Sequence, residues 1–222
     1  MSYGYFYILL LISSVFTSTI IDSTPKDIIH IGFETPLSDE WKGRYDNFKD
    51  FYQIQTEENK PYLSARSENS DCFIVKRIEV DLAEYPYLNW SWRANTLPVN
   101  GDESQKAYCD VAASIAIVLN KSRILPKSIK YSWSTTLADS TLTKSPFAYW
   151  PARCDVIVKE SGTERQGEWV TEKVNVFEDY KKLYKKKNAQ SKHVYAIVIM
   201  TDSDSTNSLS EADYADIYFS KH

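Results

Sequence analysis

The 222-residue sequence predicts an all-β protein, a jelly-roll β-sandwich of two antiparallel sheets with one short helix. The chain holds 16 Tyr and 6 Trp against 6 Gly and 2 Met, and aromatic rings pack well on pleated, half-buried strands. Short apolar segments separated by turn-forming residues follow one another along the chain, which is typical of many strands in series. Two packed antiparallel sheets bury such segments without crossover helices, which the sequence mostly lacks.

The predicted strands are short apolar runs, and in several of them apolar residues recur at every second position. Leu88, Trp90 and Trp92 alternate with polar residues, and the apolar residues at odd positions from 111 to 119 share one face. A period of two is the period of a strand. In chain order, the segments predicted as strands are residues 28–33, 72–80, 88–92, 111–119, 129–133, 154–158, 169–177, 194–201 and 214–219.

One segment has helical spacing instead. Apolar side chains between Phe177 and Tyr184 recur at intervals of three and four, which predicts a helix over residues 178–186. Acidic residues at its start and lysines further along suit the helix dipole. With no internal repeat and no linker in the sequence, we predict a single β-sandwich domain over residues 26–222.

The N-terminal segment is apolar and uncharged. No charged residue precedes Asp22, and the stretch from Tyr5 to Phe16 is followed by small polar residues. This pattern predicts a signal peptide over residues 1–19. Because no Lys or Arg marks its leading end, an uncleaved N-terminal anchor is the alternative. We therefore expect an exported protein, periplasmic or extracellular.

Charge and cysteine content restrict the partners. A net charge of −4 argues against nucleic acid, which calls for a basic face, and we expect a monomer. Cys72, Cys109 and Cys154 lack the spacing of a zinc or thioredoxin-like motif. One disulfide with an odd thiol and three buried thiols are both open alternatives.

No catalytic constellation is recognisable. The histidines are His30, His193 and His222, and no GxSxG motif is present. A Ser-His-Asp hydrolase is therefore not expected, and no residue is predicted to be catalytic.

Aromatic residues with polar neighbours predict a glycan-binding site, because a ring stacks on the apolar face of a sugar while charged side chains bond to its hydroxyls. For the aromatic residues in strands, packing in the core is the alternative. For the charges of loop 101–110, the alternative is a solvated loop. The predicted ligand-binding residues are Trp92, Arg93, Asp102, Glu103, Lys106, Asp110, Tyr131, Trp133 and Trp150.

The segment after the most apolar strand carries carboxylates two residues apart. Asp202 and Asp204 alternate with hydroxyl residues, and such oxygens can converge on Ca²⁺. Asp and Ser also form turns unaided, so turn formation is the alternative.

An ordered set of segments resembles the bacterial family called domain of unknown function 3047. The resemblance covers most of the chain after residue 60 and departs from the family pattern at Ser114, where Arg is usual, and after Tyr184. The family carries no settled activity, but its pattern is similar to that of carbohydrate-binding modules whose early and closing strands hold a structural calcium ion. That similarity adds Glu34 and Asp216 to Asp202 and Asp204 as predicted calcium ligands. The resembling segments are residues 88–93, 97–98, 101–103, 110–119, 167–180, 200–204 and 215–219.

The sequence therefore predicts a non-catalytic jelly-roll domain at the cell envelope that binds a polysaccharide or cell-surface glycan. The first alternative is a polysaccharide lyase or hydrolase that uses Asp102, Glu103 or Glu172 as acid and base. The second is a structural envelope protein that binds other proteins through an exposed sheet or apolar patch.

Overall fold

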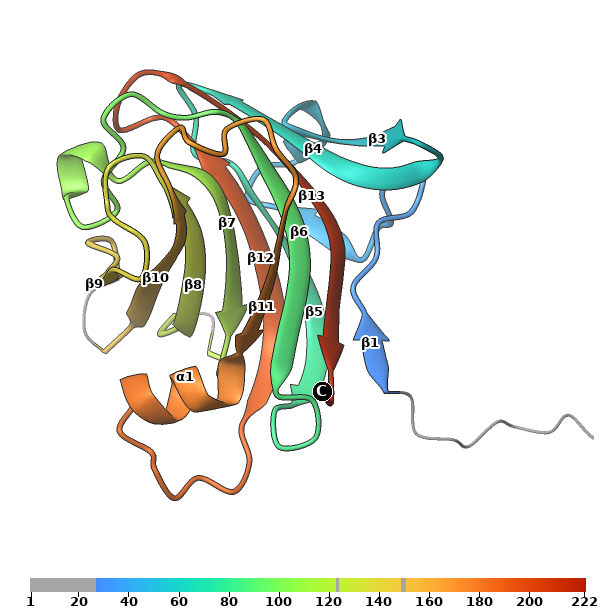
Figure 1. The fold of residues 1–222 in the computed structure, drawn as a ribbon, viewed down its shortest axis with the longest axis vertical. Coiled ribbons are helices and arrows are strands. Elements are labelled where there is room, and N and C mark those ends of the chain that lie inside the picture. Colours follow the sequence, from blue (N-terminus) through green and yellow to red (C-terminus); the bar gives the residue numbers. More distant parts are fainter. Residues whose placement is uncertain (1–26, 123, 149–150) are drawn as a thin grey trace, which may run out of the picture.

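The computed structural model describes residues 27–222 except 123 and 149–150, and it confirms the predicted fold class (Figure 1). Two sheets pack face to face as a jelly-roll sandwich. The predicted signal peptide or anchor over residues 1–19 and the predicted ligand-binding residue Trp150 lie outside the described residues. Within the described residues, no helix has the length and apolar character needed to cross a membrane.

The first sheet, sheet A, places the end of the chain near its centre. Its strands, in spatial order, are β11 (Val170–Asn175), β6 (Tyr87–Thr96), β13 (Leu209–Ser220), β4 (Lys60–Glu68) and β3 (Tyr52–Glu57), and β1 (Ile28–His30) pairs separately with β13. All of these pairings are antiparallel.

The second sheet, sheet B, packs against the inner face of sheet A. Its strands, in spatial order, are β2 (Trp41–Gly43), β5 (Phe73–Asp81), β12 (His193–Asp202), β7 (Val111–Val118), β8 (Lys127–Ser134), β10 (Arg153–Ser161) and β9 (Leu142–Lys144). Among the described strands, the pairing of β8 with β10 is the one that is parallel. Two short 3-10 turns, Phe48–Asp50 and Lys106–Tyr108, lie in the connections.

The core lies between the sheets and is built by the predicted alternation. Trp90 and Trp92 of β6 face Tyr131 and Trp133 of β8, with ring centroids 5.5 Å apart for Trp90–Tyr131 and 6.1 Å apart for Trp92–Trp133. Burial of large rings supplies most of the favourable free energy of such a sandwich. The intervening residues of each strand therefore form the outer faces of the two sheets.

The single α-helix, α1 (Val176–Leu183), begins two residues before the predicted start. Asn175 caps it by accepting a hydrogen bond from the Glu178 N–H at 3.0 Å, which satisfies one of the backbone donors exposed at a helix start. The strands β2, β3, β4 and β9 have no counterpart among the predicted segments.

The three cysteines, all within the described part of the chain, are free thiols. Cys72 and Cys109 are buried and Cys154 is partly buried. Of the two alternatives that the sequence left open, the structure has thiols rather than a disulfide.

Candidate functional site

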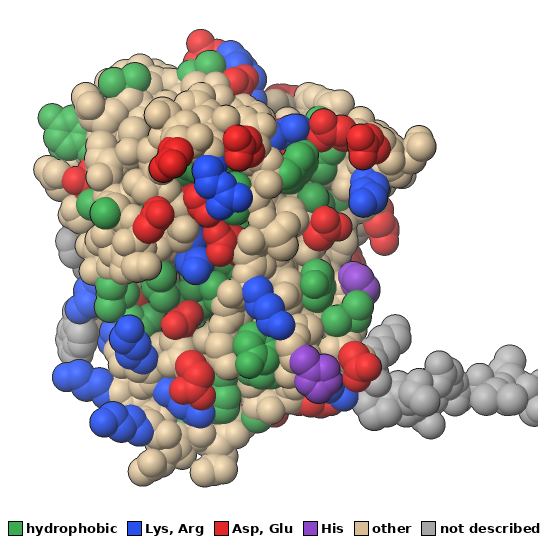
Figure 2. Space-filling view, in the orientation of Figure 1, with side chains coloured by type: hydrophobic (Ala, Val, Ile, Leu, Met, Phe, Trp, Pro, Cys, Tyr) green, Lys and Arg blue, Asp and Glu red, His purple; other side chains and the backbone are tan. Residues whose placement is uncertain are grey.

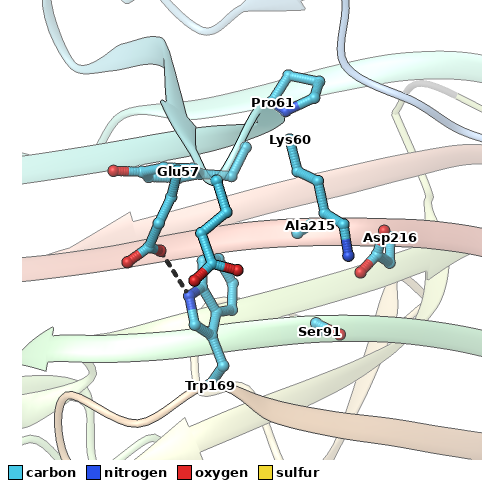
Figure 3. A pocket seen from close by; sticks show the side chains of 9 residues that line it. Glu57, Lys60, Pro61, Ser91, Trp169, Ala215 and Asp216 are labelled. Atoms are coloured by element: carbon cyan, nitrogen blue, oxygen red, sulfur yellow. Dashed lines mark hydrogen bonds between the residues drawn. The ribbon is translucent and has the colours of Figure 1, made fainter.

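A groove of about 290 Å³ crosses the outer face of sheet A, beneath the hairpin of β3 and β4 (Figure 3). The hairpin forms the upper wall, while β6, β13 and the start of β11 form the floor. The residues that line it are Glu57, Glu58, Lys60, Pro61, Tyr62, Ser91, Trp169, Ala215 and Asp216.

The hairpin is closed by a two-residue turn. Glu57 pairs with Lys60 across the turn, and Glu58 and Asn59 both have positive φ, 49° and 64°. Positive φ at both central positions is the geometry of the tight turns that match strand twist, and Asn tolerates it well. The turn thus holds Glu57 and Lys60 at the mouth of the groove.

Trp169, which directly precedes β11, is the larger of the two aromatic side chains that line the groove. Its Nε1 donates a hydrogen bond to Glu57 at 2.9 Å, and Tyr62 packs edge-on at 5.7 Å between ring centroids. The guanidinium of Arg93 lies 4.6 Å from the centroid of the Trp169 ring, a cation–π contact. Arg93 does not line the groove, so it supports the indole from outside the cavity.

The arginine is itself held by two carboxylates. Arg93 Nη2 lies 2.8 Å from Asp213 and Nη1 lies 3.3 Å from Glu57. Burial would lower the pKa of Arg93, but Asp213 and Glu57 raise it, and the net shift is upward. The hydrogen bond from Trp169 is the main cause of a lowered pKa at Glu57. Both side chains therefore stay ionised at neutral pH, and the charges that position the indole persist.

Asp216 enters the groove because β13 is irregular at this point. The pairing of β13 with β6 shifts register between Ala215 and Tyr218, and Asp216 has a φ of 50°. An irregularity of this kind turns a side chain out of the strand's alternation. In Figure 3, Lys60 extends toward Asp216 across the groove. Neither side chain makes a hydrogen bond or ion pair with another described residue, which leaves both able to bind a ligand.

A second hollow of about 430 Å³ lies on the same outer face. Glu211 at its edge accepts hydrogen bonds from Arg66 at 2.5 Å and from Thr96 at 2.7 Å. In Figure 2, which has the orientation of Figure 1, acidic and basic side chains are interspersed across the visible face. The hollow is lined by Asp50, Phe51, Gln53, Ser64, Ala65, Arg66, Asn95 and Glu211.

Three of the aromatic residues predicted to bind ligand lie in the core. Trp92, Tyr131 and Trp133 are each 0% exposed, because the alternation of β6 and β8 points them between the sheets. The Tyr131 hydroxyl donates to Asp179 at 2.8 Å, and Trp133 Nε1 donates to the Gly162 carbonyl at 3.1 Å. No ring face of these residues is accessible to a ligand. They pack in the core, which was the alternative considered from the sequence.

The predicted residues of loop 101–110 gather at sheet B, away from the groove. Asp102 accepts hydrogen bonds from Ser104 and Gln105 of its own loop. Glu103 is buried and accepts a hydrogen bond from Ser134 at 2.5 Å. The ammonium of Lys106 lies over the ring of Phe147, 5.7 Å from its centroid. Of the predicted ligand-binding residues that the structure describes, Arg93 is the one that contacts Trp169.

The predicted calcium ligands divide between different places. Asp202 and Asp204 lie with Asp110, and one ligand oxygen from each lies within 4.8 Å of the others. Asp216 lines the groove instead, and Glu34 is an exposed residue outside the three-carboxylate group.

The hydrogen bonds around the three carboxylates are those of a turn. Asp110 accepts from the backbone N–H groups of Ser205 and Thr206 at 3.1 and 2.7 Å, and from the Thr206 hydroxyl. Asp202 accepts from the Val111 N–H at 2.9 Å. Burial raises the pKa of Asp202 to about 8, although Lys130 opposes the shift. Ca²⁺ takes six to eight oxygen ligands, whereas these carboxylates already accept hydrogen bonds from backbone N–H groups. This favours turn formation, and calcium binding stays a prediction.

Of the carboxylates in the predicted enzyme alternative, Glu172 lies apart from Glu103 and its neighbour Asp102. Glu172 lies on the inner face of β11, opposite Trp90, and is hydrogen-bonded to Glu160. Burial is the main cause that raises the pKa of Glu172 to about 7. Glu103 bonds to Ser134 on the outer face of sheet B, so the sheet separates it from Glu172.

Comparison with known proteins assigns the family. A family described as "Protein of unknown function (DUF3047)" matches residues 40–218. The chain belongs to the DUF3047 family. This confirms the resemblance found in the sequence, and no curated protein matches this DUF3047 chain.

Solved structures similar to the DUF3047 chain include two xyloglucanases and an endoglucanase. The xyloglucanase domain of NopAA, a type three effector from Sinorhizobium fredii in complex with cellobiose, has a TM-score of 0.45 at 9% identity, covering 80% of this chain and 96% of that one. A family 12 xyloglucanase from Bacillus licheniformis has a TM-score of 0.42 at 12% identity, covering 80% and 97%. Endoglucanase 3 from Trichoderma harzianum has 0.42 at 9% identity, covering 75% and 80%. At these identities the similarity is one of fold.

Most residues that line the groove of this DUF3047 protein were not predicted from the sequence. Glu57, Lys60 and Tyr62 lie on β3 and β4, where no strand was predicted. A usable pattern was present, because Glu58-Asn59 is a suitable turn pair between two short runs in which apolar and polar residues alternate.

Proposed function

We propose that this DUF3047 protein is an exported, non-catalytic glycan-binding domain of the cell envelope, and that the groove beneath the β3–β4 hairpin is its binding site. The observation that carries the proposal is Trp169, an indole held in a groove by Arg93 at 4.6 Å, Glu57 at 2.9 Å and Tyr62 at 5.7 Å. A preorganised ring loses little entropy on binding. The apolar face of a pyranose stacks on the groove side of this ring.

Polar side chains around the indole complete the recognition of a sugar. Lys60 donates hydrogen bonds to hydroxyl oxygens, while Asp216 and Glu58 accept them from hydroxyl protons. All three line the groove, and none has a side-chain partner among the described residues. Hydrogen bonds to charged groups are stronger than neutral ones, so these three set the orientation of the stacked sugar.

The second hollow extends the site to more than one sugar unit. Ser91 lies in the groove and Asn95 in the second hollow, four residues apart on β6, or about 14 Å along a strand. Arg93 lies between them on the same face. The distance exceeds one hexose ring, and we infer that the ligand is a chain rather than a monosaccharide.

Two of the carboxylates are held in structural contacts, which supports a role without catalysis for those two residues. Glycosidases set two carboxyl groups roughly 5 to 9.5 Å apart on either side of the scissile bond. Glu57 in the groove is bound to Trp169 and Arg93, and Glu172 is hydrogen-bonded directly to Glu160. The apolar, uncharged N-terminal segment supports export.

A glycan array followed by isothermal titration calorimetry tests the proposal. We expect the wild-type chain to bind a neutral oligosaccharide, and Trp169→Ala to weaken that binding by at least about tenfold, or about 1.4 kcal/mol. Asp216→Ala, which changes an exposed residue, is a second variant in case Trp169→Ala fails to fold. Phe147→Ala is the matched control, because Phe147 is a 53% exposed aromatic residue outside the groove. If no glycan binds to the wild-type chain, the proposal is wrong.

A further inference from the structure

A segment of positive charge lies at the end of the molecule where α1 is found. Residues 181–192, which we call the lysine segment, contain six lysines and no Asp or Glu, although the whole chain has a net charge of −4. In Figure 2, basic side chains gather at the lower left, over the end that α1 occupies in Figure 1. Four of the six lysines are exposed and form no ion pair with a described residue, namely Lys182, Lys185, Lys186 and Lys187.

The backbone fixes how this segment leaves the helix. The helix α1 ends at Leu183, and the Lys186 N–H donates a hydrogen bond to the Lys181 carbonyl at 2.9 Å. Lys185 has a φ of 54°, in a helix-ending turn where Gly is the usual residue. The helix dipole favours Lys181 and Lys182 in the last turn of the helix. Helix ending gives no reason for a lysine at position 185, whereas an interaction with an anionic partner does.

The carboxylates around the lysine segment do not cancel its charge. Among the described residues, two carboxylates are bonded to the segment. Glu178 lies 2.9 Å from the ammonium of Lys181, and Asp81 accepts a hydrogen bond from the Ser191 hydroxyl at 2.8 Å. Six lysines against these two carboxylates leave a local excess of positive charge, which attracts an anionic surface.

The first described residue lies at the same end of the molecule as the lysine segment. The Lys192 carbonyl accepts a hydrogen bond from the Leu82 N–H at 2.9 Å. The loop that follows Leu82 reaches Glu84, which lies 3.6 Å from the ammonium of Lys221. The Lys221 N–H donates to the Asp27 carbonyl at 3.2 Å. A continuous line of contacts therefore joins the lysine segment to Asp27, where the described structure starts.

The sequence before Asp27 adds an apolar segment at this end. The stretch from Tyr5 to Phe16 is apolar, and no charged residue precedes Asp22. Attachment to a membrane surface combines burial of apolar groups with attraction of basic side chains to anionic lipids. Clusters of roughly four to eight lysines or arginines next to an apolar segment bind anionic lipid headgroups. Both features are thus directed to one end of this chain.

We propose that the lysine segment docks on a membrane surface that carries anionic phospholipids, beside the point where the apolar N-terminal segment joins the domain. A membrane fits better than a nucleic acid or an acidic polysaccharide, because only a membrane also takes up an apolar segment. The six residues of β11, about 20 Å of strand, lie between Trp169 and α1. Docking at the α1 end therefore leaves the Trp169 groove away from the membrane and open to a ligand.

Co-sedimentation of the full chain with lipid vesicles tests the inference. One set of vesicles consists of phosphatidylcholine alone, and the other of an equal mixture of phosphatidylcholine and phosphatidylglycerol. We expect binding to the mixture to be at least about tenfold tighter, because its headgroups are anionic. This difference should shrink as the salt concentration rises. The apolar N-terminal segment meets the same hydrocarbon in both vesicles, so it does not produce the difference.

Two triple variants assign the difference to the lysine segment. The first replaces three lysines that follow α1 and should lose most of the preference for the mixed vesicles; it carries Lys185→Gln, Lys186→Gln and Lys187→Gln. The matched control has the same net charge and should keep the preference, since it replaces three exposed lysines outside the segment, with Lys42→Gln, Lys49→Gln and Lys106→Gln. Both variants should keep the wild-type circular dichroism, because all six side chains are exposed.

Three outcomes would overturn the inference. The first is equal binding of the wild-type chain to the two kinds of vesicle, and the second is a lysine-segment variant that binds like the matched control. The third is binding of the segment to polygalacturonate without any preference for the mixed vesicles, which would assign it to an acidic polysaccharide. Trp169→Ala should bind the vesicles as the wild type does, so a groove that binds no glycan would leave this inference intact.

Discussion

The carboxyl group of Glu172 should make the stability of this protein depend on pH. Glu172 is 11% exposed, and its Oε2 lies 3.5 Å from the ammonium of Lys159. Burial, together with the neighbouring carboxylate of Glu160, raises its pKa from 4.5 to about 7, although Lys159 opposes the shift. The folded protein therefore holds a proton at this position more tightly than the unfolded chain does.

The sign of the effect follows from that difference in proton binding. The stabilisation is fully present below pH 4.5 and is lost as the pH rises through 7. Between these values each pH unit changes the free energy of unfolding by at most about 1.4 kcal/mol. Solvent at the edge of the sandwich screens part of this, so we expect a loss of about 1–2 kcal/mol between pH 5 and pH 8.

Substitution of Glu172 by Gln isolates this contribution. The amide keeps a donor for Glu160 and an acceptor for Lys159, but it does not titrate. In urea unfolding, Glu172→Gln should match the wild-type chain at pH 5 and exceed it by about 1–2 kcal/mol at pH 8. Glu164→Gln is the control, because Glu164 is exposed. Parallel pH curves for the wild type and Glu172→Gln would refute the reasoning.

Three further outcomes follow from single contacts and from the carboxylate turn. Asn175→Ala removes the cap at the Glu178 N–H and should lower the free energy of unfolding by about 1 kcal/mol in urea titration, so an unchanged value would contradict it. Gly43→Ala would place a Cβ 2.1 Å from the Cβ of Phe48 and should cost about 2–3 kcal/mol or more by the same measurement. Calcium chelation should leave the unfolding midpoint unchanged in calorimetry, because Asp110 and Asp202 already accept hydrogen bonds from backbone N–H groups. A lowered midpoint would instead support the predicted calcium site.

Most of the fold was predictable because the core imposes a simple pattern. Strands that bury one face show alternation, as in Leu88, Trp90 and Trp92 of β6, and such segments were recognised. The hairpin of β3 and β4 was missed because both strands are largely polar outside a few buried positions such as Leu63. A strand that forms the wall of a groove buries few side chains in the core, so its sequence shows little alternation of apolar and polar residues.

The site was harder to predict because contacts between distant segments create it. Trp169 is fixed by Glu57, which lies 112 residues away, and Asp216 enters the groove through an irregularity in β13. Neither the contact between the two edges of sheet A nor a shift of register is visible in local sequence. The loop from Asp102 to Asp110 was recognised as charged, but its carboxylates turned out to organise the loop and the neighbouring turn.

The alternation that built the core also distinguishes core aromatics from ligand-binding ones. Val170 and Val174 of β11 are buried, so residues of the opposite phase lie on the outer face of sheet A. Trp169 has that opposite phase, whereas Trp90 and Trp92 share the buried phase of β6. In a sandwich strand, an aromatic residue out of phase with its buried neighbours is therefore the stronger candidate for binding. That rule selects Trp169 from the sequence once the phase of its strand is known.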